Sequence, residues 1–215
     1  MAVQFEETCS YFLFLAVCLY FIKIFILLMT TIKMEIKRMA FSFENLDQIT
    51  RRLMIDEVDY DLKNGNLYIS PRLTLKGTKE YAKLLKNASQ TGNEITLAND
   101  LRTNGIIKPF ELRRTKTGTT TAKVPITAPE TLAEGEFNRF YIRALCRRVI
   151  EEKTGKLEVY RAKQVSRPRS SSQAKIGQII DPSKLLADLR NNPGVDTALG
   201  LPAGPNSGLS VRIIT

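Results

Sequence analysis

Residues 127–152 read TAPETLAEGEFNRFYIRALCRRVIEE. Thr127 and Glu130 have the spacing of a capping box, and Pro129 falls in the first turn, where its missing N–H costs nothing. Apolar side chains then recur on a broad stripe: Leu132, Phe137, Phe140, Tyr141, Ala144, Leu145, Val149 and Ile150. Such a stripe predicts a long helix that is buried along one side and ends before Thr154 and Gly155. We therefore expect a central helix against which the other elements pack. Gly135, inside it, marks either a close packing point or a later helix start.

Shorter elements precede this helix. A short amphipathic helix is predicted at about 45–55. A first β-hairpin is predicted at 58–69, because Val58, Tyr60 and Leu62 alternate with polar residues before a turn at Asn64 and Gly65.

Two more helices and a second hairpin are predicted next. Apolar spacing indicates helices at 78–88 and 94–103, with a C-terminal stop at Asn104 and Gly105. A hairpin of 110–115 and 119–124 follows, because β-branched residues are concentrated in the returning segment.

The part after the long helix begins with a predicted strand at 157–162. A basic, flexible linker is expected at 166–173, and a helix then starts at Pro182 with Asp181 as its cap. Turn-forming residues dominate from 191 to 208, and we expect a structural loop at 202–208 anchored by Leu199 and Leu201. A last strand at 209–213 closes the chain.

These elements predict one α+β domain from about residue 39 to 214. It should contain two β-hairpins, a long central helix and a turn-rich C-terminal tail. We divide the chain into an N-terminal segment at 1–38, a core at 39–165, the basic linker at 166–173 and a C-terminal part at 174–215.

The apolar run at 11–32 decides between a membrane anchor and a mis-assigned start. Its length suits a membrane span, and the flanking charges would then leave the C-terminal domain in the cytoplasm. Lys23 opposes this, because a lysine inside a bilayer is costly. Translation from Met39 is the alternative: Met34 and Glu35 would be encoded by a purine-rich stretch resembling a bacterial ribosome-binding site. We expect a cytoplasmic protein from a bacterium, plasmid or phage, with a single-pass membrane protein as the alternative.

Composition narrows the function. The formal net charge is +10, and nearly all of the excess falls after Met39, which favours nucleic acid or another polyanion as partner. The chain has no histidine, which removes Ser-His-Asp and Cys-His catalysis and most zinc sites. Cys146 is the only cysteine outside the first 38 residues and fits a reducing compartment. We expect no cofactor and no bound metal.

Three groups of basic residues are candidates for nucleic-acid binding. Arg139, Arg143 and Arg147 recur every four residues on the long helix and would line one ridge. The alternative is a solvated face, on which Glu136 pairs with Arg139 or Arg143 and Glu151 pairs with Arg147. The other groups are Arg113, Arg114 and Lys116 on the second hairpin, and Arg161, Lys163, Arg167 and Arg169 around the linker.

The segment 78–124 loosely resembles a winged helix. Arg113, Arg114, Lys116 and Lys123 would lie on its wing. The sequence departs from that pattern in two ways. The would-be recognition helix carries Glu94 and Asp100 with only Arg102 as a cation, and a predicted hairpin sits between the first and second helices, where that fold keeps a single strand.

A metal-dependent nuclease is a further alternative, for which carboxylates must converge on magnesium ions. Asp56, Glu57, Asp59 and Asp61 cluster at the first predicted hairpin, where Asp59 and Asp61 would share a strand face. A solvated hairpin edge explains these residues better. Our leading interpretation is a non-enzymatic protein that binds nucleic acid, with an assembly component held by protein contacts, a nuclease and a membrane-anchored domain facing anionic lipid as alternatives.

Overall fold

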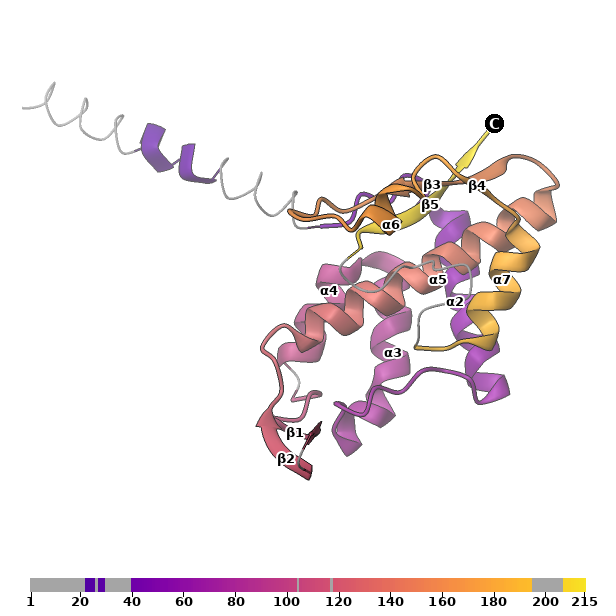
Figure 1. Ribbon diagram of the computed structural model, residues 1–215. Helices are drawn as coiled ribbons and strands as arrows, with labels where there is room; N and C mark the ends of the chain where they lie inside the picture. The colour runs from indigo at the N-terminus through magenta and orange to yellow at the C-terminus, as the bar shows by residue number, and fades with distance from the viewer. Residues whose placement is uncertain (1–21, 26, 30–39, 104, 117, 195–206) are drawn as a thin grey trace, which may run out of the picture. The chain divides into compact units, whose positions relative to one another are not determined.

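Figure 1 shows a computed structural model of the chain. It describes residues 22–25, 27–29, 40–103, 105–116, 118–194 and 207–215. The chain separates into two units, Met1–Ala40 and Phe41–Thr215. In the first unit, residues 22–25 and 27–29 are helical. Every element named below belongs to the second unit.

The described residues contain no helix that is both long and apolar enough to cross a membrane. Most of the apolar run at 11–32 lies outside those residues, as does the alternative start at Met39. The predicted loop with its anchors Leu199 and Leu201 also lies outside them, apart from its end at 207–208.

The body begins with helix α2, Gln48–Asn64. Asp47 caps it by accepting a hydrogen bond from the Thr50 amide, and Gly65 ends it in the left-handed region with φ of 67°. The first predicted hairpin is therefore wrong, because its first strand is the second half of a helix. The side chains that α2 buries are three or four residues apart, which is the helical period: Thr50, Leu53, Met54, Glu57, Val58 and Asp61.

Two helices follow where the sequence placed them, α3 at Leu75–Thr91 and α4 at Glu94–Thr103. Residues 66–74, all of them described, form no regular strand, but Leu73 makes an isolated antiparallel bridge with Ile107. Gly77 lies so close to this point that a Cβ there would be 2.5 Å from the carbonyl oxygen of Ile106. The start of α3 is thus fixed against the base of the next hairpin.

That hairpin consists of β1, Phe110–Thr115, and β2, Gly118–Lys123. The strands are antiparallel, with Phe110 opposite Lys123 and Thr115 opposite Gly118. The second predicted hairpin is confirmed to within one residue at each end. In Figure 1 it lies at the same end of the body as the start of α3.

The long helix is α5, Ala128–Glu152, and it runs through the middle of the body (Figure 1). It packs against α2, α4 and the C-terminal helix α7, Pro182–Asn191, and it also contacts the sheet. Phe137, Phe140 and Leu145 are fully buried in the core, as expected from the apolar stripe. The predicted capping box does not form in the described structure, because Thr127 makes no side-chain cap hydrogen bond. Gly135 is not a close packing point, since a Cβ there would meet nothing within 4 Å.

A three-stranded antiparallel sheet packs against α5, where Asn138 forms hydrogen bonds with Leu209 and Ser210. Its centre is β3, Lys156–Arg161, which pairs with β4, Ile179–Ile180, on one side and β5, Leu209–Ile214, on the other. The predicted linker contains a short helix, α6, at Ser170–Gln173. The predicted cap of α7 is confirmed, because Asp181 accepts a 2.8 Å hydrogen bond from the Lys184 amide. The α+β class and the long central helix are therefore confirmed.

Candidate nucleic-acid interface

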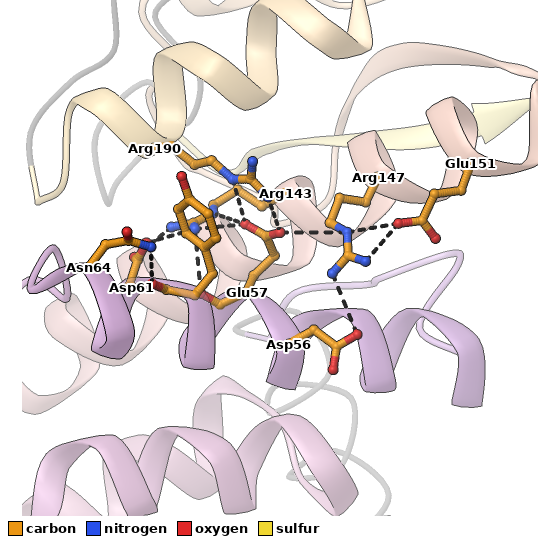
Figure 2. A network of polar contacts seen from close by, with 9 residues as sticks. Asp56, Glu57, Asp61, Asn64, Arg143, Arg147, Glu151 and Arg190 are labelled. Atoms are coloured by element: carbon orange, nitrogen blue, oxygen red, sulfur yellow. Dashed lines mark hydrogen bonds and ion pairs between the residues drawn. The ribbon is translucent and has the colours of Figure 1, made fainter.

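The arginines predicted on α5 lie in the interior. Arg143 is only 1% exposed and meets two carboxylates of α2. Its Nε donates to Glu57 at 2.8 Å, and its two terminal nitrogens donate to the two oxygens of Asp61 at 2.6 and 2.8 Å (Figure 2). Arg143 therefore pairs with both carboxylates and binds Asp61 bidentately. Because the pair lies in a low-dielectric core, its stability depends strongly on this geometry.

Two more arginines extend the network around Glu57 (Figure 2). Arg190 comes from α7, donates to both Glu57 oxygens and stacks over the Tyr60 ring at 4.1 Å. Arg147, three-quarters buried, forms ion pairs with Glu57 at 3.7 Å and with Glu151 at 2.6 Å. Burial alone would raise the pKa of Glu57, but hydrogen bonds from Arg190 and Arg143 outweigh it and hold the pKa below its usual value. Glu57 is therefore an internal counter-charge that joins α2, α5 and α7.

Arg139 is buried at the end of α7. Its guanidinium donates to the carbonyl oxygens of Asn192 at 2.7 Å and Leu189 at 3.3 Å, and it lies 3.6 Å from Glu136. A cation suits these carbonyls, because they carry the negative end of the helix dipole. The predicted pairs of Glu136 with Arg139 and of Glu151 with Arg147 are both present.

The predicted exposed ridge on α5 is therefore wrong for Arg139 and Arg143. In this conformation neither side chain reaches solvent, so neither offers its charge to a phosphate. The physical reason is that α5 is covered on most of its circumference by α2, α4, α7 and the sheet, and α2 supplies carboxylates four residues apart, Glu57 and Asp61. The four-residue spacing of these carboxylates is visible in the sequence. It does not reveal their partner, because Arg143 lies more than 80 residues further along the chain.

Glu136 is a second buried carboxyl, and one of its oxygens, Oε2, has no hydrogen-bond partner in the described structure. Burial raises its pKa to about 7, although Arg139 opposes the shift. The hydroxyl of Tyr81, also fully buried, lacks a partner among the described residues, and burial followed by the charge of Glu136 raises its pKa.

Glu136 is expected to make stability depend on pH. Its folded pKa of about 7 exceeds the ordinary 4.5, so folding favours the protonated form. Relative to higher pH, the protonated carboxyl adds at most about 3 kcal/mol to the free energy of unfolding. This stabilisation is fully present below pH of about 4.5 and is lost as the pH rises to about 7. Glu136→Gln cannot ionise, so its free energy of unfolding should rise relative to the wild type across this window. Urea unfolding of both proteins between those pH values measures the difference, and a constant difference would contradict the assignment.

The hairpin of β1 and β2 carries the exposed cations. We call Arg113, Arg114, Lys116 and Lys123 the hairpin cations, and all four are exposed. Arg113 pairs with Glu111 at 2.9 Å, whereas no ion pair among the described residues involves Arg114, Lys116 or Lys123. The structure therefore brings the three predicted hairpin residues, Arg113, Arg114 and Lys116, together with Lys123 on one solvated element.

The basic residues around the linker are divided between internal contacts and solvent. Arg161 donates to the Ser207 carbonyl at 2.6 Å and to Gln173 at 3.0 Å, and Lys163 pairs with Glu134. Arg167 and Arg169 are exposed just before α6. Only these two remain turned to solvent, and in Figure 1 α6 lies by the sheet, away from the β1–β2 hairpin.

The predicted carboxylate site does not assemble. Asp59 and Asp61 lie on a helix, not a strand, so residues two apart point to different sides. Asp59 pairs with Lys86 at the surface, whereas Asp61 is buried against Arg143. Across the described ranges, no group of three or more acidic or cysteine side chains is arranged to hold a metal ion.

The helix α4 has little positive charge to offer. Glu94 is buried and accepts a hydrogen bond from the Phe41 amide at 2.8 Å. Arg102, the only cation of α4, pairs with Glu130 of α5. The order α2, α3, α4, hairpin removes one departure from the winged-helix pattern, since the described residues between α2 and α3 contain no hairpin and only the isolated bridge at Leu73. The would-be recognition helix nevertheless remains without a free cation in the described structure.

Comparison with known proteins adds no functional information. No family model, curated protein or solved structure matches the chain.

Proposed function

We propose that this protein binds nucleic acid without catalysing a reaction, in a bacterial, plasmid or phage setting, and that the hairpin cations form the contact surface. The observation that carries the proposal is the division of the basic residues. The arginines of α5 are paired with carboxylates, Arg143 inside the fold and Arg147 and Arg148 nearer the surface. The four hairpin cations are exposed, and three of them form no ion pair among the described residues.

The position of the hairpin supports this role. Its strands bury little of their side-chain surface, so the hairpin adds little to the core. Its base is nevertheless held by main-chain hydrogen bonds, from the Thr74 amide to the Ile106 carbonyl and from the Lys108 amide to the Arg72 carbonyl, both 2.8 Å. A fixed element that presents cations to solvent is suited to contact phosphates.

Binding of labelled DNA and RNA, followed by fluorescence anisotropy across about 50–200 mM salt, tests the proposal. We expect the logarithm of the affinity to fall linearly with the logarithm of the salt concentration, because each neutralised phosphate releases counterions. No binding at the lowest salt concentration would refute the proposal.

A second candidate is an assembly component that associates through protein contacts. Leu75 and Ile126 are both 87% exposed and Leu112 is 78% exposed, and assembly would require such side chains to be covered together by a partner subunit. Light scattering distinguishes the two, because a large discrete oligomer without nucleic-acid binding would support assembly.

A further inference from the structure

A pocket opens at the base of the hairpin. Its volume is about 430 Å³, within the range of ligand-binding sites. Six residues from two segments line it: Pro71, Arg72, Lys108, Phe110, Glu111 and Leu112. The walls are thus partly apolar, and cations stand beside them.

Two of the apolar residues are turned to solvent. Phe110 is 52% exposed and Leu112 is 78% exposed. They occupy alternate positions of β1, so they share one face of the hairpin with Arg114. Lys123 lies directly opposite Phe110 and on the same face. This face therefore combines an aromatic ring with two exposed cations.

The other wall of the pocket is held in place by ion pairs. Arg72 donates to both oxygens of Glu111, at 2.6 and 3.2 Å, and Arg113 donates to the same carboxylate at 2.9 Å. Lys108 Nζ donates to the Pro71 carbonyl at 2.8 Å. Among the described residues, Glu111 is thus the single carboxylate beside Arg72, Arg113 and Lys108, so the net charge around the pocket is positive.

We propose that this pocket receives an unpaired base of a single-stranded nucleic acid. The base stacks on the ring of Phe110, and the neighbouring phosphates contact Lys108, Lys123 and Arg114. This inference rests on the proposed function and adds the class of ligand. An exposed aromatic ring beside cations is the arrangement that binds single strands, because every base has a face on which a ring can stack.

A duplex fits the same surface less well. Its bases are stacked on each other, so Phe110 and Leu112 would gain no partner from its backbone. A major groove admits a helix or a two-stranded ribbon. The only cation of α4 is paired with Glu130, and a hairpin lying in the groove would bring the apolar Phe110 and Leu112 into it beside its cations. The apolar part of the hairpin surface therefore favours the single strand.

The test compares a labelled single strand of about 16 nucleotides with the duplex of the same sequence. Phe110→Ala should weaken single-strand binding about 5- to 150-fold and leave duplex binding little changed. The salt dependence of single-strand binding should stay the same, because the ring carries no charge. Phe110→Tyr should retain most of the affinity. Ile126→Ala, which removes an exposed apolar side chain outside the pocket, should have no effect on binding.

The outcomes separate the inference from the function on which it rests. Salt-dependent binding that Phe110→Ala leaves unchanged, or tighter binding of the duplex than of the single strand, would overturn the inference and leave the proposed function standing. Absence of any binding to either ligand would remove both. Thermal unfolding of each variant checks that the half-exposed ring is not needed for folding.

Discussion

Arg143→Met is expected to lower the free energy of unfolding by about 3–5 kcal/mol, because it leaves Asp61 buried without its cation. Glu57 keeps Arg190, so the largest loss should come from Asp61. Arg143 also lies over the Phe140 ring at 4.9 Å, and methionine retains part of that packing. Chemical denaturation monitored by far-ultraviolet circular dichroism measures the change.

Arg148→Met is the matched control on the same helix. Arg148 pairs with Asp47 at 2.6 Å and Glu152 at 3.0 Å, but both carboxylates are about half exposed, so the loss should be at most about 1 kcal/mol. Adding Asp61→Asn to Arg143→Met should recover part of the lost stability, because the uncompensated charge is removed. Equal stability of Arg143→Met and the wild type would show that the network does not hold α2 to α5.

Replacing all four hairpin cations by glutamine is expected to weaken binding of nucleic acid by at least about tenfold at physiological salt, if each cation contacts a phosphate. Stability should change little, because these side chains are exposed and form few internal contacts. Anisotropy titrations at one salt concentration measure the loss, and denaturation curves confirm the fold.

Two controls define the location of the surface. Glutamine at Lys63, Lys153, Lys156 and Lys184, four exposed lysines on other elements, removes the same charge and should cost much less affinity. Glutamine at Arg167 and Arg169 tests the other predicted group. If either set weakens binding as strongly as the hairpin variant, the affinity depends on the net charge of the protein and not on where the cations lie. The hairpin would then not be the contact surface.

The sequence predicts the elements whose signals are local. The stripe in α5 and the cap at Asp181 each need only neighbouring residues, and both are present in the structure. The hairpin of β1 and β2 is found for the same reason, since β-branched residues lie beside a turn.

The first predicted hairpin fails because its turn signal is ambiguous. Asn64 and Gly65 can start a hairpin or end a helix, since both require glycine at positive φ. The alternation of Val58, Tyr60 and Leu62 favours the strand, whereas the spacing of the buried Glu57, Val58 and Asp61 is helical. Tertiary contact with α5 decides between them.

Burial of the arginines is also beyond the reach of a local pattern. A row of arginines on a helix looks the same whether its partners are water, phosphates or distant carboxylates. Arg143 meets carboxylates from α2, and Arg139 meets carbonyl oxygens at the end of α7, so only the folded chain distinguishes these cases. The exposed hairpin cations, by contrast, lie where the sequence placed them.

The salt dependence of single-strand binding, measured for the wild type and for the variant with four glutamines, tests the central claim most directly. Each phosphate contact adds about 0.7 to the slope of log affinity against log salt for a single strand, so the slope should fall by about 2–3 in magnitude. An unchanged slope would mean that the hairpin cations do not contact phosphates and would contradict the proposed interface.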